Sequence, residues 1–232
     1  MLHRDDHGAR GLPRFTMSRR QGITALAAAW LAGPAWADKQ ELAAALSPTS
    51  RDFEGPYRPL PGTAWGDSQL ALETSAPSPG LPIRVGGRVV DTEGRPLPGL
   101  VVQLWQANAT GRYNHPAETP GHGVPDPAFR GYGQTLTDAT GCYAFQSIRP
   151  SGYRRTLFGF VPWRFVPHIH IAVRASDRDL LVTQIDVERE VAGERNAAAS
   201  GVPALMNSAA LKALPNPRGE LLQFDIVLAL AG

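Results

Sequence analysis

Residues 81–107 read LPIRVGGRVVDTEGRPLPGLVVQLWQA, and this stretch decides the fold. It holds two strand-like apolar runs, at 83–90 and 100–106. The residues between them supply turn chemistry twice, as DTEG at 91–94 and as PLPG at 96–99. Two short apolar runs joined by turns that contain Gly and Pro predict two β-strands rather than a helix.

The same pattern recurs along the chain, which has 24 glycines and 21 prolines among its 232 residues. Further strand-like runs stand at 141–148, 168–174, 180–187 and 221–230. The spread of Gly and Pro divides the chain into short pieces, which suit strands and turns better than long helices. Six short strands with long connections predict an all-β fold, a β-sandwich with long functional loops and little helix.

Composition divides the chain into three parts. Residues 1–37 form a leader, residues 38–80 an N-terminal arm rich in Pro, Gly and Ser, and residues 81–232 the β-sandwich domain. Short helices are expected at 38–46 and at 202–214. An extended arm of this kind can exchange onto a neighbouring copy, so the sequence also predicts a homo-oligomer of unspecified order.

Two long connections, at 107–140 and 149–166, are rich in Gly, Pro and aromatic residues. Loops of this length in a compact domain are usually functional or disordered. Their content of Tyr, Trp and Phe favours a functional role.

The leader has the features of a secretory signal peptide. Arg19 and Arg20 precede an apolar run at 23–32, and Ala35-Trp36-Ala37 is a small-x-small cleavage signal. The apolar run is half as long as the roughly 20 residues that a membrane span needs. The paired arginines resemble a twin-arginine signal. The sequence therefore predicts an exported protein, periplasmic or extracellular, with no membrane span.

Charge and cysteine content exclude other classes. Five arginines and two aspartates lie in residues 1–37, which leaves 18 basic and 19 acidic residues in the rest of the chain. This balance gives no support to a nucleic-acid-binding surface. Cys142 is the single cysteine, so no intrachain disulfide can form, and its strand-like surroundings favour a core residue over a nucleophile.

A pair of histidines interrupts an apolar strand. Residues 166–173 read VPHIHIAV. Because side chains alternate along a strand, His168 and His170 point to one face and Ile169 points to the other. Two imidazoles on one strand face can bind one metal ion, although two separately satisfied histidines would show the same pattern.

The long loops supply tyrosines rather than carboxylates. Tyr113, Tyr132 and Tyr153 lie there, and no carboxylate stands near the histidine pair in the sequence. A phenolate is a hard anion that suits Fe(III), and a bound metal lowers the phenol pKa from about 10. An Asp or Glu from elsewhere in the chain would instead indicate a ferrous site of two histidines and one carboxylate, and most loop tyrosines have packing roles.

The chain resembles the intradiol ring-cleavage dioxygenases, the protocatechuate and catechol dioxygenase group. The resemblance is carried by several pieces in order along the chain. They are PTSRDFEGPY (48–57), GRVVDTEGRPLPGLVVQLWQANATGRYNHP (87–116), TDATGCYAFQSIRPSGY (137–153), PHIHI (167–171), LVTQ (181–184) and FDIVL (224–228).

This resemblance implies that 81–232 is a catalytic domain holding one non-haem Fe(III) through Tyr113, Tyr153, His168 and His170. It implies that Tyr113 remains a ligand, whereas Tyr153 leaves when substrate binds. Either the displaced Tyr153 phenolate or a bound hydroxide then acts as general base. The implied reaction inserts both atoms of O₂ into a small aromatic diol, such as catechol, protocatechuate or hydroxyquinol, and yields a muconate-type diacid.

The resemblance also implies that Arg164 and Gln184 flank the substrate and stabilise charge on its ring, and Tyr57 is a further candidate for the substrate pocket. Arg164 departs from the family pattern, because it stands four residues before His168, one position further back than is usual. Two alternatives remain. One is a non-catalytic extracytoplasmic β-sandwich module that binds an aromatic or carbohydrate ligand. The other is a cupin-like ferrous or copper site with a third histidine or a carboxylate.

Overall fold

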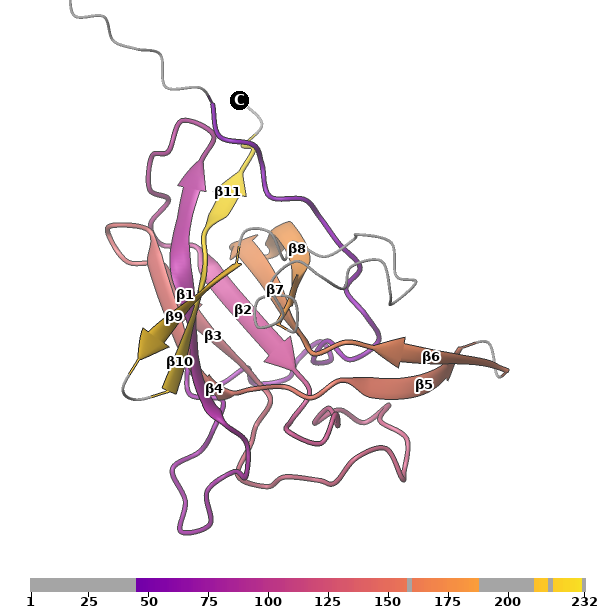
Figure 1. Ribbon diagram of the computed structural model, residues 1–232. Helices are drawn as coiled ribbons and strands as arrows, with labels where there is room; N and C mark the ends of the chain where they lie inside the picture. Colours follow the sequence, from indigo (N-terminus) through magenta and orange to yellow (C-terminus); the bar gives the residue numbers. More distant parts are fainter. Residues whose placement is uncertain (1–44, 158–159, 188–210, 217–218, 231–232) are drawn as a thin grey trace, which may run out of the picture. The chain divides into compact units, whose positions relative to one another are not determined.

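The computed structural model describes residues 45–157, 160–187, 211–216 and 219–230 (Figure 1). These residues belong to a compact unit that spans Ala43–Gly232. Within the described ranges the chain forms strands β1 to β11 and no helix. The fold class expected from the sequence, all-β with little helix, is therefore confirmed.

The first sheet is built around the long strand β1 (Pro82–Asp91). Strand β4 (Cys142–Ile148) pairs antiparallel with one edge of β1. On the other edge, β10 (Gly219–Phe224) and β11 (Ile226–Leu228) pair with β1 in parallel, one after the other. Strand β9 (Leu211–Asn216) pairs antiparallel with β10 and ends the sheet.

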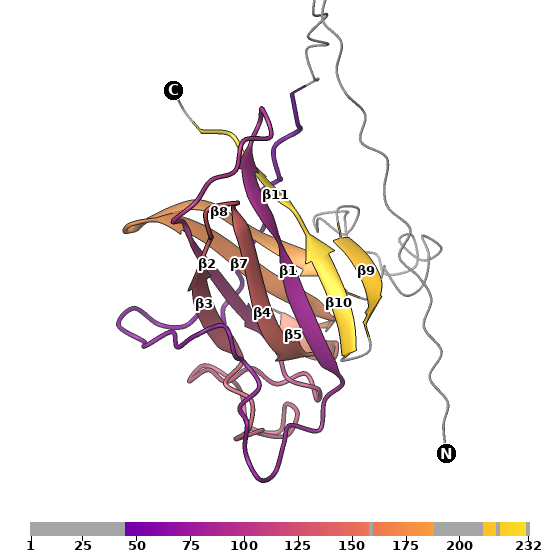
Figure 2. The ribbon, with the colours of Figure 1, turned by 90° about the vertical axis from the view of Figure 1, so that its left-hand side faces the viewer.

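The second sheet is antiparallel and has the order β3-β2-β7-β8. A separate two-stranded hairpin, β5-β6, extends beyond it. Figures 1 and 2 show the two larger sheets as layers that face each other, with the hairpin projecting to one side. The strands are β2 (Val101–Gln106), β3 (Tyr132–Leu136), β5 (Tyr153–Leu157), β6 (Val161–Phe165), β7 (His168–Ala175) and β8 (Arg178–Asp186).

The core lies between the two layers. On β7, Ile169, Ile171 and Val173 are fully buried among the core residues, whereas His168 and His170 point away from them. This is the alternation that the sequence predicted for the histidine strand. The first sheet contributes apolar side chains from β1, β4, β10 and β11, including Val85, Val89, Tyr143, Phe145, Leu222, Phe224 and Ile226.

The last predicted strand, 221–230, is interrupted. Exposed Asp225 separates β10 from β11, and its Oδ1 accepts a hydrogen bond of 2.9 Å from the backbone N–H of Arg88. A side-chain carboxylate thus replaces the backbone carbonyl that a continuous strand would offer there.

The sequence missed three strands, β3, β5 and β6, which lie in segments expected to be loops. On β5 the apolar alternation is hidden, because Arg155 shares a face with Tyr153. The helix expected at 202–214 is wrong over 211–214, which lie in β9, while 202–210 lie outside the described residues. Of the helix expected at 38–46, only 45–46 are described, and they are not helical. The leader, 1–37, also lies outside the described part.

The N-terminal arm packs on its own chain along most of its described length. Thr49 N–H donates to Val227 O at 2.9 Å, Asp52 N–H to Val182 O at 3.0 Å, and Leu70 is fully buried in the core. Between these contacts, Gly55 and Tyr57 lie over the outer face of the second sheet, the face to which the histidines point, where Gly55 approaches the ring of His170 and Tyr57 stacks on Tyr113. Homo-oligomerisation stays a prediction.

An ion pair fastens the arm to β8, and its removal gives a measurable prediction. Arg58 donates to both carboxylate oxygens of Asp179, at 2.8 and 3.0 Å. These hydrogen bonds hold the pKa of the Asp179 carboxyl below its usual value of 3.8. We expect Asp179→Asn to lower the free energy of unfolding at neutral pH by about 1 kcal/mol.

The pH dependence of this loss of stability follows from the direction in which the pKa of Asp179 is shifted. A carboxyl whose pKa is depressed in the folded state stabilises the fold above its unfolded pKa, and the contribution disappears as pH falls through the folded pKa. Urea unfolding of wild type and Asp179→Asn is therefore expected to differ most at neutral pH and to converge at acid pH, as pH falls through the lowered folded-state pKa of Asp179. The exposed Asp177, in the turn before β8, supplies the control: Asp177→Asn should match wild type at both pH values. A constant gap at acid pH would contradict the ion-pair explanation.

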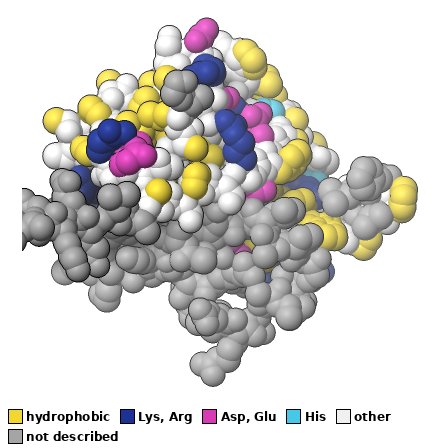
Figure 3. All heavy atoms as spheres, turned by 90° about the horizontal axis from the view of Figure 1, so that it is seen from above, with side chains coloured by type: hydrophobic (Ala, Val, Ile, Leu, Met, Phe, Trp, Pro, Cys, Tyr) yellow, Lys and Arg dark blue, Asp and Glu magenta, His cyan; other side chains and the backbone are white. Residues whose placement is uncertain are grey.

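Charges of both signs mix on the surface. On the face shown in Figure 3, basic side chains lie beside acidic ones, with apolar side chains between them. In the part of the chain that is described, no helix has the length and apolar character that crossing a bilayer requires.

Candidate metal centre

The outer face of the second sheet carries a buried cluster of polar aromatic side chains. His168 and His170 come from β7, Tyr113 comes from the loop after β2, and Tyr153 comes from the first residue of β5. His168, His170 and Tyr113 are each 3% exposed. The structure thus brings together four residues that the sequence resemblance singled out, from three separate segments.

The oxygen and nitrogen atoms of these four side chains converge. Tyr113 Oη lies 3.0 Å from His168 Nε2 and 3.2 Å from His170 Nε2. Tyr153 Oη lies 3.5 Å from His168 Nε2. Buried polar atoms at these distances need shared protons or a shared cation.

Backbone contacts fix the state of one imidazole. His168 Nδ1 lies 2.7 Å from the carbonyl oxygen of Val166, which can only accept, so Nδ1 carries the proton and Nε2 keeps its lone pair. This support is typical of metal-binding histidines. His170 stacks on Trp105 with ring centroids 4.9 Å apart and an interplanar angle of 3°. Burial lowers the pKa of both imidazoles, so both are neutral and able to bind a cation.

The phenols are protonated in the absence of a cation. Burial raises the pKa of Tyr113 and of Tyr153 well above 10. The Tyr113 hydroxyl can donate its proton to one imidazole at a time, although two Nε2 atoms lie within reach. A cation with affinity for phenolate and imidazole would satisfy all four atoms together, so the residues fit a metal ion.

The alternatives based on a third histidine or a carboxylate find no support in the described residues. Across those ranges no group of three or more His, Cys, Asp or Glu side chains is placed to hold a metal ion. The donor set on this face is two phenols and two imidazoles, which suits a harder cation than sites rich in Cys.

The arm completes the surroundings of the cluster. Tyr57 stacks on Tyr113 with centroids 4.5 Å apart. Gly55 has a φ of 74°, and a Cβ at this position would lie 3.1 Å from His170 Cε1. Gln184, opposite His170 in the β7-β8 register, donates from Nε2 to Phe53 O at 2.5 Å. The predicted Tyr57 and Gln184 therefore both border the cluster.

The structure does not bring Arg164 to the cluster. The hairpin register pairs Tyr153 with Phe165 and Arg154 with Arg164. Cross-strand partners share a face and neighbours alternate, so Arg164 lies on the face opposite Tyr153, and it is exposed. Displacement by one position along a strand moves a side chain to the other face, which is why the shifted spacing of Arg164 matters.

Two residues that sequence reasoning missed lie beside the tyrosines. Arg155 is on the Tyr153 face of the hairpin, and Glu118 is in the loop that carries Tyr113. Both oxygens of Glu118 lie 2.9 Å from Arg155 Nη2. Nothing in a single sequence links positions 118 and 155, which are far apart in the chain.

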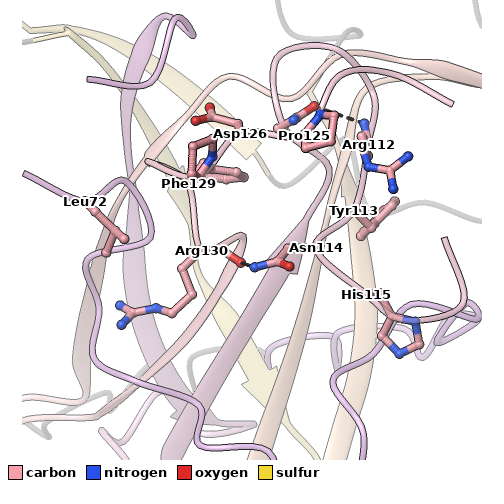
Figure 4. A pocket seen from close by; sticks show the side chains of 11 residues that line it. Leu72, Arg112, Tyr113, Asn114, His115, Pro125, Asp126, Phe129 and Arg130 are labelled. Carbon is pink, nitrogen blue, oxygen red and sulfur yellow. Dashed lines mark hydrogen bonds between the residues drawn. The ribbon is translucent and has the colours of Figure 1, made fainter. Parts of the chain in front are cut away.

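A cavity of about 540 Å³ lies beside the loop that follows β2 (Figure 4). Asn114 is one of the residues that line it and donates to the carbonyl oxygen of Arg130 at 3.0 Å. Tyr113 is the one member of the four-residue cluster in its lining, so this cavity adjoins the cluster without containing it.

The sandwich and its buried donor set define the class: an all-β protein with a centre of two tyrosines and two histidines suited to one metal ion. A family model described as Dioxygenase matches residues 54–230. The chain belongs to the intradiol ring-cleavage dioxygenase family.

Named relatives agree with this assignment. A protocatechuate 3,4-dioxygenase beta chain from Burkholderia cepacia is 41% identical over 98 residues, which cover 39% of this chain and 37% of that protein. Catechol 1,2-dioxygenase 2 from Acinetobacter lwoffii is 30% identical over 149 residues, covering 60% of this chain and 51% of that one. The matches therefore span little more than half of these curated relatives at most.

A solved structure extends the likeness over most of the chain. It is the dioxygenase domain of a fusion of a dioxygenase and a carbohydrate-binding protein from Streptomyces sp. SirexAA-E. It is 28% identical, with a TM-score of 0.54, and the match covers 80% of this chain and 100% of that one.

Proposed function

We propose that this protein is a non-haem Fe(III)-dependent intradiol dioxygenase. The observation that carries the proposal is the convergence of four side-chain donor atoms. Tyr113 Oη lies 3.0 Å from His168 Nε2 and 3.2 Å from His170 Nε2, and Tyr153 Oη lies 3.5 Å from His168 Nε2. Two phenols beside two neutral imidazoles are a set that a hard, highly charged cation favours.

The substrate class follows from the family. Relatives are named as dioxygenases of protocatechuate, catechol and hydroxyquinol, and each of these is an aromatic ring with adjacent hydroxyls. We infer a small catechol-type ring as substrate. One diol and one O₂ give one muconate-type diacid, because the bond between the two hydroxylated carbons breaks and both oxygen atoms enter the product.

Tyr113, Tyr153, His168 and His170 would hold the ferric ion. When bound, the ion supplies a Lewis acid that draws electron density from the diol ring. His168 keeps its Nε2 lone pair available because Nδ1 donates to Val166 O. His170 is held in orientation by its parallel stacking on Trp105. These contacts fix both imidazoles before any cation binds.

The two tyrosines have different surroundings and different roles. Tyr113 is buried between both imidazoles and stacks on Tyr57, so it is the permanent donor. Tyr153 is only partly buried, lies on a two-stranded hairpin and has the longest contact, at 3.5 Å. In the metal-loaded protein its phenolate oxygen can take a proton from a diol hydroxyl as general base. Gln184, beside His170, lies where it can orient the ring of the substrate.

Two measurements test the proposed function: the visible spectrum of the iron-loaded protein and the identity of the reaction product. Phenolate-to-Fe(III) charge transfer is expected to give the purified protein a broad visible band with one iron per chain, and Tyr153→Phe is expected to shift that band. Catechol, protocatechuate and hydroxyquinol would be supplied in turn, with oxygen uptake and product analysis. A colourless iron-loaded protein, or a yellow semialdehyde product from cleavage outside the two hydroxyls, would overturn the proposal.

Export is a second part of the proposal, supported by the leader sequence. Arg19 and Arg20 before the apolar run at 23–32 point to the twin-arginine route. Fractionation of cells that express the full chain is expected to place it outside the cytoplasm, and replacement of both arginines by lysine is expected to retain it inside. Equal distribution of the two forms would contradict export by this route.

A further inference from the structure

We propose that Arg155 is a positioning residue that sets the placement of the two tyrosine donors relative to each other through its ion pair with Glu118. This inference rests on the iron-dependent function proposed above. It concerns an arginine that the family resemblance did not single out, and its role differs from the substrate contact that the resemblance implied for Arg164.

Arg155 lies over the ring of Tyr153. The two residues are separated by one position on β5 and therefore share a face of the hairpin. The guanidinium carbon is 4.4 Å from the Tyr153 ring centroid, and the side chain is 10% exposed. Arg155 Nε also donates to Tyr57 Oη at 3.2 Å. One guanidinium thus contacts Tyr153 and the tyrosine that stacks on Tyr113.

Glu118 connects this guanidinium to the Tyr113 segment. Its side chain is fully buried, and both carboxylate oxygens lie 2.9 Å from Arg155 Nη2. The same carboxylate accepts the backbone N–H of Tyr113 at 2.9 Å. His122 Nδ1 stands 3.5 Å away. Because the pair is buried, loss of either partner leaves a charge without compensation, and the local structure must rearrange.

The position of the Arg155–Glu118 ion pair explains how it controls the placement of Tyr153 relative to Tyr113. An isolated two-stranded hairpin is only marginally stable, so β5-β6 needs anchors. One anchor precedes Tyr153: Ser151 donates through N–H to Asn108 O at 3.1 Å and through Oγ to Ala109 O at 2.7 Å. Arg155 is the anchor that follows Tyr153. Tyr153 is therefore held from both sides, and only the second anchor also reaches Tyr113.

The hairpin supplies a matched control. Arg154 is adjacent to Arg155 but lies on the opposite face, paired with Arg164, and it is exposed. Arg154→Met and Arg155→Met remove the same charge and the same number of hydrogen-bond donors from neighbouring positions. A difference between the two variants therefore reports the face of the hairpin and not the net charge.

The experiment compares wild type, Arg155→Met, Arg155→Lys and Arg154→Met as full-length ferric proteins. We expect Arg155→Met to hold iron 10- to 100-fold more weakly, an order of magnitude typical of residues that support metal ligands. Its visible band is expected to move to longer wavelength, because a cation over the ring stabilises the phenolate that donates the electron. Arg155→Lys is expected to fall between wild type and Arg155→Met, and Arg154→Met to match wild type.

The outcomes separate this inference from the proposed function. If wild type binds no ferric iron and shows no visible band, the proposed function fails whatever Arg155 does. If wild type is coloured and Arg155→Met keeps its band position and iron affinity, the positioning role alone fails, even when the variant melts at a lower temperature. Should Arg155→Met not fold, Arg155→Lys and Glu118→Gln decide: an unshifted band in both overturns the role.

Discussion

Tyr113→Phe is expected to abolish retention of ferric iron and to reduce turnover of a catechol-type substrate by more than about 100-fold, the upper end for groups that merely support a ligand. Tyr113 Oη is the only atom within hydrogen-bond distance of both His168 Nε2 and His170 Nε2 among the contacts of this cluster. Without this oxygen, the imidazoles lose their common partner, and the proposed ion loses its most buried donor.

The variant is informative because its fold should survive. The phenyl ring keeps the stacking on Tyr57, at 4.5 Å between centroids, and loses one buried hydroxyl. Loss of the hydroxyl hydrogen bond costs about 1 kcal/mol in the metal-free protein. Iron per chain, the visible spectrum and oxygen uptake would be measured, with Tyr132→Phe as the control. That variant removes a hydroxyl from β3 of the second sheet, away from the four donors. Full iron content and normal turnover in Tyr113→Phe would refute the donor assignment.

Gly87→Ala is expected to destabilise the fold by about 3 kcal/mol, the upper end for overpacking a well-packed interior. A Cβ at Gly87 would lie 2.0 Å from the carbonyl oxygen of Phe224 and 2.6 Å from its carbonyl carbon. Both are backbone atoms, so no side-chain rotation relieves the contact. Phe224 O also accepts the hydroxyl of buried Tyr143 at 2.6 Å, and a shift of this carbonyl would break that hydrogen bond.

Urea unfolding measures this effect, with Arg84→Ala as control. Arg84 is exposed on the same strand, and we expect its replacement to change stability by less than about 0.5 kcal/mol. If Gly87→Ala is as stable as Arg84→Ala, then β1 and β10 are not as close at this point as the structure places them.

The stretch 81–107 determined the first two strands because its apolar runs and turns act locally. Strand β1 covers the predicted 83–90, and β2 covers 101–106 of the predicted 100–106. The assignment of His168 and His170 to one face and Ile169 to the other was also a local prediction, because side chains alternate along a strand whatever its partners are. The break at Asp225 was not predictable, because it depends on a contact with Arg88 across the sheet.

The candidate site divides in the same way. Motifs at Tyr113, Tyr153, His168 and His170 were recognisable in the sequence, as were Tyr57 and Gln184. Arg155 could not be told apart from the adjacent Arg154 by sequence alone, and its ion-pair partner Glu118 is far away in the chain. Their pairing depends on the loop after β2 folding back against the hairpin, which no local pattern encodes.

By itself, the sequence determined the alternation of strands and turns, the choice of chemically suitable side chains, and their order along the chain. These properties follow from nearest-neighbour backbone preferences and from hydrophobic periodicity. The tertiary structure alone decided which arginine faces the tyrosines. The register of β5 against β6 places Arg155 inward and Arg164 outward, and a buried carboxylate, Glu118, compensates the inward charge.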